Sequence, residues 1–266
     1  MNKEIRGTAL VTGASSGIGR EYAIQLARRG CDVILTARRG DRLRELEQLI
    51  GAQSGRKVVS IVSDLADAAG VQYLLAELRT RGVVPDLLIN NAGRGYYGAA
   101  VNTPAAVVNQ MLRLNIEALT TLSLELGRAM AARGSGGIIN VASTAAYQPV
   151  PYLAVYAATK AYVINFSEAL AAELSCSGVR VFTVAPGATR SEFVEAAGVA
   201  KEFTERFAFV ATSAEGLVER SLQAFERQVY GDTYVDGLFN QAGALFSRIS
   251  PRFLVTYLTA GLLRTD

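Results

Sequence analysis

The chain contains 266 residues, which suffices for one large domain or two modest ones at roughly 150 residues per domain. Half of the residues are hydrophobic and 19% are charged, as in globular proteins and unlike disordered or collagen-like chains. No histidine is present, which excludes a Ser-His-Asp triad, a histidine general base and a histidine metal site. We therefore expect acid–base chemistry to use Tyr, Lys, carboxylates or Cys, and we predict no metal site.

The cysteines and the charge pattern bear on location and partners. Cys31 and Cys176 form no Cys-x-x-Cys pair, which favours reduced thiols and a cytoplasmic protein. The net charge of +3 is dispersed among acidic neighbours, so nucleic acid is not an expected partner. Residues 1–6 lead directly into a strand-like segment, and no apolar run approaches the roughly 20 residues of a membrane span. We expect a soluble protein without a signal peptide.

Short apolar runs alternate with amphipathic helical patterns along the chain. Such runs, rich in Val, Ile and Leu, are typical of a parallel sheet with helices on both faces, so we predict a doubly wound α/β fold. No linker or repeat divides the pattern, which indicates a single domain over 1–237 and an amphipathic extension over 238–266. The predicted strands are 8–12, 33–35, 58–62, 87–89, 138–141 and 179–184, with a last strand-like segment at 233–235; the longest predicted helices are about 104–113, 115–132 and 152–175.

A glycine-rich turn, Thr12-Gly13-Ala14-Ser15-Ser16-Gly17-Ile18-Gly19, follows the first predicted strand and precedes a helix. Gly13 can adopt a tight turn, Gly17 lets a pyrophosphate approach the backbone, and Gly19 permits close packing of helix on sheet. The same residues match a G-x-S-x-G nucleophile elbow, but no histidine is available to activate Ser15. We predict that Ser15 and the helix N-terminus bind cofactor phosphates; a purely structural turn is the alternative.

The second predicted strand ends at Thr36-Ala37-Arg38-Arg39. A site for NAD would place an acidic residue here to bind the ribose hydroxyls, and Ala37 cannot do so. Arg38, with help from Arg39, could instead pair with a 2′-phosphate, which would change affinity by about ten- to a hundred-fold. We predict a preference for NADP(H); the alternative is that both arginines are solvated at the start of a helix.

Tyr156 and Lys160 are four residues apart in a predicted helix and therefore share one face, and Ser143 follows the fifth predicted strand. Hydride transfer to a carbonyl needs a proton donor, but a phenol with a pKa near 10 is a weak base at neutral pH. An ammonium about 4 Å away could lower this pKa by about three units at an effective dielectric constant near 20. We predict that Lys160 does so. Both could be ordinary helix residues, but their combination with Ser143 and the glycine turn favours a catalytic site.

These residues together resemble the short-chain dehydrogenase/reductase family over nearly the whole chain. The resemblance implies that Tyr156 is the catalytic acid/base, that Lys160 lowers its pKa and binds the nicotinamide ribose, and that Ser143 polarises the carbonyl. Asn115 would hold a water in a proton relay through Lys160. The motifs are Thr12-Gly13-x-x-x-Gly17-x-Gly19, Asn90-Asn91-Ala92-Gly93, Asn115, Ser143, Tyr156-x-x-x-Lys160 and Pro186-Gly187.

The same resemblance implies further cofactor contacts and a homodimer or homotetramer. Asp64 would contact the adenine, Asn91-Ala92-Gly93 would line the adenosine side, and Thr189 would lie near the carboxamide or the phosphates. Thr159 replaces a serine that is frequent in the family, without altering the chemistry. The predicted cofactor-binding residues are Gly13, Ser15, Ser16, Gly17, Ile18, Gly19, Arg38, Arg39, Asp64, Leu65, Asn91, Ala92, Gly93, Tyr156, Lys160, Pro186, Gly187 and Thr189.

Substrate choice is expected to depend on residues 94–98, 147–152 and 191–210, which are aromatic and mostly uncharged. They favour an apolar carbonyl compound or alcohol, although core packing would explain the same phenylalanines. The extension over 238–266 is expected to pack on the body or on a subunit partner rather than on a membrane surface, because its basic residues are sparse. The predicted function is an NADP(H)-dependent oxidoreductase; the alternative is a non-catalytic dinucleotide-binding regulator or scaffold.

Overall fold

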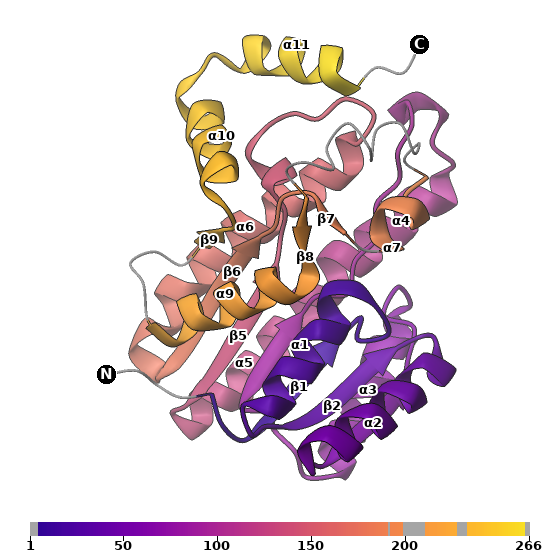
Figure 1. Cartoon of the computed structure of the whole chain (residues 1–266), viewed down its shortest axis with the longest axis vertical. Coiled ribbons are helices and arrows are strands. Elements are labelled where there is room, and N and C mark those ends of the chain that lie inside the picture. Colours follow the sequence, from indigo (N-terminus) through magenta and orange to yellow (C-terminus); the bar gives the residue numbers. More distant parts are fainter. Residues whose placement is uncertain (1–4, 191, 199–210, 228–232, 264–266) are drawn as a thin grey trace.

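A computed structural model describes residues 5–190, 192–198, 211–227 and 233–263. Within these residues a sheet of parallel strands forms the centre of the molecule (Figure 1), in the order β3-β2-β1-β4-β5-β6-β9. The chain order reverses between β1 and β4, where open parallel sheets bind their ligands. The strands are β1 (Thr8–Thr12), β2 (Asp32–Ala37), β3 (Val58–Val62), β4 (Leu87–Asn90), β5 (Gly136–Val141), β6 (Val179–Ala185) and β9 (Thr233–Val235).

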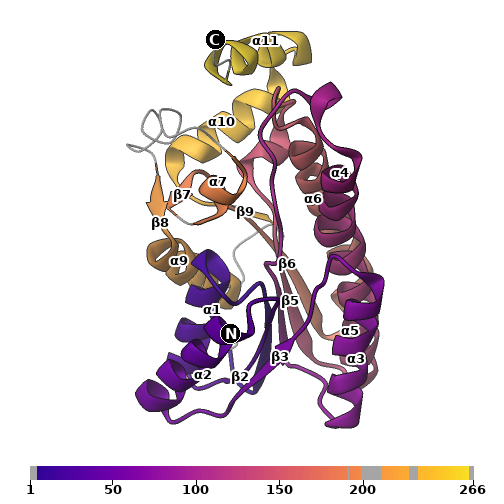
Figure 2. The same ribbon diagram turned by 90° about the vertical axis from the view of Figure 1, so that its right-hand side faces the viewer.

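Helices cover both faces of this sheet (Figure 2). One core contains side chains of α1, α2 and α9, and the core on the opposite face contains side chains of α3, α5 and α6. The predicted doubly wound α/β fold is therefore confirmed. The helices are α1 (Gly17–Arg28), α2 (Gly40–Ser54), α3 (Ala68–Thr80), α5 (Leu119–Arg133), α6 (Ala154–Leu174) and α9 (Ala214–Arg227).

The central strands are buried on both faces. In β1, Ala9 and Val11 belong to the core beneath α1 and α9, whereas Leu10 belongs to the core beneath α3 and α5. This two-sided burial is why the strands appear in the sequence as continuous apolar runs rather than alternating ones. Tyr22 of α1 is fully buried, and its hydroxyl lies 2.7 Å from Ser221 Oγ of α9, which joins the two helices.

Two helices differ from the sequence prediction. The helices predicted over about 104–113 and 115–132 form one continuous run: α4 (Ala105–Leu112), a π-helical segment η2 (Arg113–Ala118) and α5. Such π-helical turns occur frequently at functional sites, and this one contains Asn115. The long helix α6 begins at Ala154 rather than near residue 152, because Tyr152 has a positive φ of 63° that cannot continue into a helix.

Shorter elements and two C-terminal helices complete the described part of the chain. Both views place α11 at one extreme end of the molecule, beyond α10 (Figures 1 and 2). None of the described helices combines the length and the apolarity needed to cross a bilayer. These elements are η1 (Ala100–Asn102), η3 (Thr144–Tyr147), η4 (Ser175–Ser177), β7 (Thr189–Arg190), α7 (Glu192–Ala196), β8 (Thr212–Ser213), α10 (Leu238–Ile249) and α11 (Arg252–Leu263).

Candidate active site

A continuous cavity of about 800 Å³ follows the carboxyl ends of the strands. The segments after β1, β2, β3, β4, β5 and β6 all contribute to its wall, so residues far apart in the sequence meet there. Of the predicted site residues, Gly19 and Asn115 lie behind this wall. The others line it: Gly13, Ser15, Ser16, Gly17, Ile18, Arg38, Arg39, Asp64, Leu65, Asn91, Ala92, Gly93, Ser143, Tyr156, Lys160, Pro186, Gly187 and Thr189.

The glycine turn after β1 packs closely against the loop after β4. Gly13 has a φ of +67°, and a Cβ there would lie 2.9 Å from the Cα of Ala92, a backbone atom. A Cβ at Gly19 would meet the carbonyl oxygen of Gly13. Asn91 Nδ2 donates to the Thr12 carbonyl oxygen at 3.0 Å, which ties the two segments together. The glycine spacing therefore reflects close backbone approach on both sides of the turn.

The N-terminus of α1 borders the cavity. Ser16 occupies the N-cap position, but its side chain makes no capping hydrogen bond to the helix. The N–H groups of the first turn therefore retain the capacity to bind an external acceptor, and the helix dipole adds a partial positive charge. With Ser15, Gly17 and Ile18 also in the wall, this corner has the chemistry of an anion-binding site.

Hydrogen bonds hold the Arg39 side chain against the glycine turn. Its guanidinium donates to Ser15 Oγ at 3.0 Å, to Ser16 Oγ at 2.7 Å and to Glu192 Oε2 at 2.8 Å. Hydrogen bonds from Arg39, and then from Arg42, lower the pKa of the Glu192 carboxyl below its usual range. This network joins the loop after β2 to α7, and it engages the arginine that the sequence suggested as a helper for Arg38.

Arg38 has a much looser environment than Arg39. Its Nη1 lies 3.9 Å from Asp64 Oδ2, and both side chains are about half exposed or more, so this ion pair is weak. Asp64 also accepts a hydrogen bond from the Ala66 N–H at 3.0 Å. Leu65, next to Asp64, is buried and lines the cavity. Arg38 is therefore the arginine with more freedom to pair with an anionic group.

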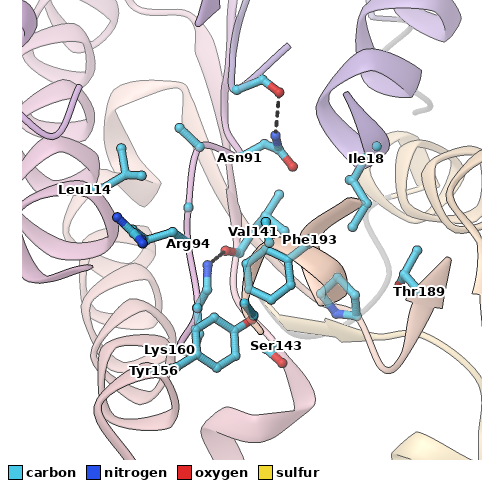
Figure 3. Close-up of a pocket in the computed structure, with 18 of the residues that line it drawn as sticks. Ile18, Asn91, Arg94, Leu114, Val141, Ser143, Tyr156, Lys160, Thr189 and Phe193 are labelled. Atoms are coloured by element: carbon cyan, nitrogen blue, oxygen red, sulfur yellow. Dashed lines mark hydrogen bonds between the residues drawn. The ribbon is translucent and has the colours of Figure 1, made fainter. Parts of the chain in front are cut away.

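Ser143, Tyr156 and Lys160 meet at the cavity wall beyond β5 (Figure 3). Tyr156 and Lys160 are both buried in the first half of α6, one turn apart, and Ser143 follows the end of β5. The Tyr156 hydroxyl lies close enough to the side chain of Ser143 for Ser143 to influence its ionisation. Lys160 Nζ donates to the Val141 carbonyl oxygen at 2.7 Å and lies 5.9 Å from the centre of the Tyr156 ring.

Burial controls the ionisation of both groups on α6. It raises the pKa of Tyr156 to about 12, and the Ser143 side chain acts in the opposite direction. Burial also lowers the pKa of Lys160 to about 8. The net direction is opposite to the lowering expected from Lys160, because desolvation of the phenol dominates and the Lys160 ammonium donates to the Val141 carbonyl.

Asn115 connects three segments behind the catalytic groups. Its Oδ1 accepts from the Arg94 N–H at 3.0 Å, and its Nδ2 donates to the Arg94 carbonyl oxygen at 2.9 Å and to Thr159 Oγ1 at 3.0 Å. Thr159 in turn donates to the Tyr156 carbonyl oxygen at 2.7 Å. Sequence reasoning treated Thr159 as neutral, but its hydroxyl links the π-helical segment to the turn of α6 that carries Tyr156.

The other end of the cavity is mostly apolar. The ring of Phe193 in α7 packs on Tyr156, with 5.3 Å between ring centroids. Thr259 of α11 also lines the wall, and its hydroxyl donates to the Pro149 carbonyl oxygen at 3.1 Å. No local sequence signal indicated Thr259, because long-range packing brings it there. Further wall residues come from the segments expected to govern substrate choice, namely Arg94, Gly95, Gln148, Val150, Phe193, Ala196 and Ala197.

Part of the segment predicted for substrate choice lies outside the described residues. Phe203, Phe207 and Phe209 belong to this part, so their predicted contribution to the site stays a prediction.

Comparisons of the sequence and of the structure with known proteins agree on one family. Residues 7–202 match the family model described as short chain dehydrogenase. Among curated relatives, the "Probable oxidoreductase EphD" of Mycobacterium tuberculosis is 35% identical over 189 residues, which cover 71% of this chain. The match covers 32% of that relative, so the chain spans about a third of its length.

Two solved structures are similar along more than nine-tenths of the chain. The short-chain dehydrogenase from Sphingobium yanoikuyae in complex with NADPH is 34% identical, with a TM-score of 0.81 and coverage of 91% of this chain and 93% of that one. The bulky-bulky ketone specific alcohol dehydrogenase from Comamonas testosteroni is 29% identical, with a TM-score of 0.76 and coverage of 95% and 96%. On the family model, the sequence relatives and the shared fold, the chain belongs to the short-chain dehydrogenase family of oxidoreductases.

Proposed function

We propose that this chain is an NADP(H)-dependent oxidoreductase that interconverts an apolar carbonyl compound and its alcohol, with Tyr156 as the acid/base. The main support is that Ser143, Tyr156 and Lys160 share one cavity with the N-terminus of α1. The helix N-terminus suits a pyrophosphate, and the buried phenol suits a carbonyl oxygen that must receive a proton. A non-catalytic binding protein would not need all three side chains together.

The cavity wall has the groups that a dinucleotide requires. Ser15, Ser16 and the first turn of α1 would hold the pyrophosphate, Asp64 and Leu65 the adenine, and residues 91–93 the adenosine side. Lys160 and residues 186–189 would hold the nicotinamide half, and the bound nicotinamide would supply or accept the hydride. The volume of about 800 Å³ is within the range of small-molecule sites.

Arg38 is the residue that we assign to the 2′-phosphate of NADP(H). Its only described ion-pair partner, Asp64, is 3.9 Å away, so the guanidinium can turn toward a phosphate at little cost. Ala37 offers no carboxylate for the ribose hydroxyls of NAD. The NADPH bound in the Sphingobium yanoikuyae relative supports the same preference.

Tyr156 is poised to donate a proton in the direction of reduction. With a pKa of about 12 it is protonated throughout the neutral range. Ser143 Oγ accepts from the Ala145 N–H at 3.1 Å, which leaves its own proton for Tyr156 or for a substrate oxygen. Lys160, with a pKa of about 8, carries a positive charge at neutral pH and would stabilise the phenolate that proton transfer leaves behind.

Asn115 would act through the proton path rather than on the substrate. It lies outside the cavity wall, and both ends of its amide hold neighbouring segments. We assign to Asn115 the role of holding a water molecule, and this water would belong to a relay that returns a proton through Lys160 to Tyr156.

The substrate class follows from the wall around Tyr156. Phe193, Val150, Leu153 and Ala197 give this end an apolar surface. Its polar groups are Gln148, Thr259 and Arg94, whose guanidinium is hydrogen-bonded to Gln110. Such a surface favours ketones, aldehydes or alcohols with aliphatic or aromatic substituents over highly charged compounds. The ketone specificity named for the Comamonas testosteroni relative supports this class.

The test is turnover of a panel of apolar ketones and aldehydes, followed by the absorbance of NADPH, for the unaltered chain and Tyr156→Phe. We expect Tyr156→Phe to lose at least about a hundred-fold in kcat and to retain NADPH binding. The matched control is Tyr162→Phe on the same helix, whose hydroxyl bonds to Thr120 on the outer surface and which should keep full activity. Full turnover by Tyr156→Phe would show that another group transfers the proton.

A further inference from the structure

The two C-terminal helices have the reverse of the usual polarity for helices on a protein surface. Among the side chains of α10 and α11 that the structure describes, those buried against the body are Ser247, Val255 and Thr259, two of which are polar. Nine of their exposed side chains are large and apolar, and these are 38% to 82% exposed. We call this surface the C-terminal apolar face; it consists of Leu238, Phe239, Leu245, Phe246, Ile249, Phe253, Leu254, Tyr257 and Leu258.

Hydrogen bonds hold the helices in this orientation. Ser247 Oγ donates to Gln148 Oε1 at 2.6 Å. The Thr259 hydroxyl lies 3.1 Å from the Pro149 carbonyl oxygen, and its proton is shared with the Val255 carbonyl oxygen of its own helix at 2.9 Å. Gln148 and Pro149 belong to the segment after η3, so the two helices are anchored at separate points on the body. A helix anchored by its polar side leaves its apolar side toward solvent, where an amphipathic helix normally places polar residues. The apolar face therefore needs a covering partner.

Most of the exposed large apolar side chains among the described residues belong to the C-terminal apolar face. It supplies nine of their sixteen exposed large apolar side chains. The other seven are dispersed over β3, α3, the loop before β4, η1, α4, α5 and α6. A second copy of the chain would therefore offer no comparable apolar surface for this face to pack on, other than the same face.

The charges of the segment disfavour that self-pairing. Its basic residues are sparse, which on the sequence alone favours packing on the body or on a subunit partner, but no carboxylate of α10 or α11 offsets them, so the segment favours an anionic partner. No acidic residue occurs between Asp236 and Asp266. Arg252 is exposed beside the apolar side chains, and Arg248, also exposed, lies with its guanidinium 5.2 Å from the centre of the Tyr147 ring. Asp236 is buried and paired with Arg220, so it does not neutralise them. Two copies meeting face to face would bring arginines together without carboxylates of the segment to compensate, whereas anionic lipid headgroups would attract them.

The position of the face fits a broad, deformable surface. Figures 1 and 2 both show α11 at the extreme end of the molecule, so a flat bilayer can reach it without meeting the sheet. We propose that the C-terminal apolar face docks on the surface of an anionic lipid bilayer, with its aromatic and aliphatic side chains in the interface and its arginines at the headgroups. The helices lie on the membrane and do not cross it.

This docking would place the substrate end of the cavity close to the lipid. Thr259, on the buried side of α11, lines that end of the cavity. An apolar substrate dissolved in the bilayer would then have a short path to Tyr156. The docking itself does not depend on the proposed oxidoreductase function and can be tested without any substrate.

The test is co-sedimentation of the full chain with vesicles of phosphatidylcholine alone or with about 30% phosphatidylglycerol. We expect saturable binding that is tighter to the anionic vesicles. The double variant Ile249→Ser/Phe253→Ser, which alters side chains that are 74% and 77% exposed, should bind at least about tenfold more weakly. Arg248→Gln/Arg252→Gln should lose about fivefold per arginine on anionic vesicles and little on neutral ones.

The matched control is Leu124→Ser, which removes an exposed leucine of α5 and should not alter vesicle binding. Circular dichroism and NADPH titration report whether each variant is folded, and single Phe253→Ser replaces the double variant if that does not fold. The proposal is overturned if the unaltered chain does not bind vesicles, or if Ile249→Ser/Phe253→Ser binds as well as the unaltered chain. A concentration-dependent dimer in ultracentrifugation that this variant abolishes, without vesicle binding, would identify a second copy as the partner instead.

Discussion

The two ends of the cavity are the cofactor end, beside the N-terminus of α1, and the substrate end, around Tyr156 and Phe193. They differ in how far apart in the sequence their residues lie. At the cofactor end, short segments directly after β1, β2, β3 and β4 contribute the wall, and backbone contacts such as that between Asn91 and Thr12 fix them. At the substrate end, α7, α11 and the segment after η3 all contribute to the wall, and Thr259 bonds to a carbonyl oxygen 110 residues away. The residues at the cofactor end therefore belong to short local motifs, whereas those at the proposed substrate end are brought together by tertiary packing.

The two ends also differ in how they handle charge. Arg38, Arg39 and Asp64 at the cofactor end are solvent-accessible, so their charges cost little to maintain. Tyr156 and Lys160 are buried, and desolvation moves the pKa of each away from its usual value. Substitutions at the two ends should consequently show different signatures: affinity changes for the cofactor at one end, and pH-dependent changes at the other.

A large effect is expected from the dependence of stability on the buried ammonium. Because the pKa of Lys160 is about 8 when folded and near 10.5 when unfolded, the unfolded chain binds more protons between these values, and stability should rise with pH across this window. The full change corresponds to about 3 kcal/mol. Urea unfolding at several pH values gives the free energy of unfolding of the unaltered chain and of Lys160→Met. The difference between these two free energies measures the effect of Lys160.

In this experiment the Lys160→Met variant also loses the hydrogen bond to Val141, which adds an offset to the difference in stability between the two chains. The prediction therefore concerns only how the difference in unfolding free energy between the two chains changes with pH. A difference that stays constant from pH 7 to 10.5 would show that Lys160 is not desolvated as described.

At the cofactor end, Arg38→Ala should weaken NADPH binding by about ten- to a hundred-fold and leave NADH binding nearly unchanged. Ala37→Asp combined with Arg38→Ala should reverse the preference between the two cofactors. Calorimetric titration measures both affinities. Arg44→Ala, on the exposed face of α2 and paired with Asp41, is the matched control. An unchanged ratio of affinities in the double variant would remove Arg38 from the 2′-phosphate site.

The direction of the reaction should respond to pH through Tyr156. Reduction needs the protonated phenol, which is present throughout the neutral range, whereas oxidation needs the phenolate. Below the pKa of about 12 the phenolate fraction rises about tenfold per pH unit, so alcohol oxidation should accelerate strongly with pH while reduction does not. Initial rates in both directions between pH 6 and 9 test this. Oxidation that is insensitive to pH in this range would point to a lower Tyr156 pKa during catalysis.

A smaller effect is expected from the hydroxyl behind the catalytic groups. Thr159→Val removes the bonds to Asn115 and to the Tyr156 carbonyl oxygen, and we expect a loss of about tenfold in kcat with little change in KM. Thr159→Ser keeps the hydroxyl and should restore most of the activity. If Thr159→Val and Thr159→Ser have equal kcat values, the link between Asn115 and α6 has no part in catalysis.

The fold could be predicted because its strands are buried on both faces and its helices are amphipathic, so each leaves a pattern in the sequence. The glycine turn could be predicted because its backbone contacts require specific glycines at fixed spacing. The four-residue spacing likewise placed Tyr156 and Lys160 on one helix face.

Other features could not be predicted because they depend on packing. The full burial that raises the pKa of Tyr156 is not visible in a four-residue spacing. The division of roles between Arg38 and Arg39 depends on Glu192, which lies 153 residues beyond Arg39. The amphipathic pattern of the C-terminal segment was visible, but which side of each helix faces the body depends on anchors such as Ser247.

The measurement that most directly tests the central claim is a calorimetric titration of the unaltered chain with NADPH and then with NADH. We predict saturable binding of one cofactor per chain, tighter for NADPH because Arg38 pairs with the 2′-phosphate. Failure of folded protein to bind either cofactor would contradict the assignment of the glycine turn and of the cavity to a dinucleotide, and with it the proposed oxidoreductase function.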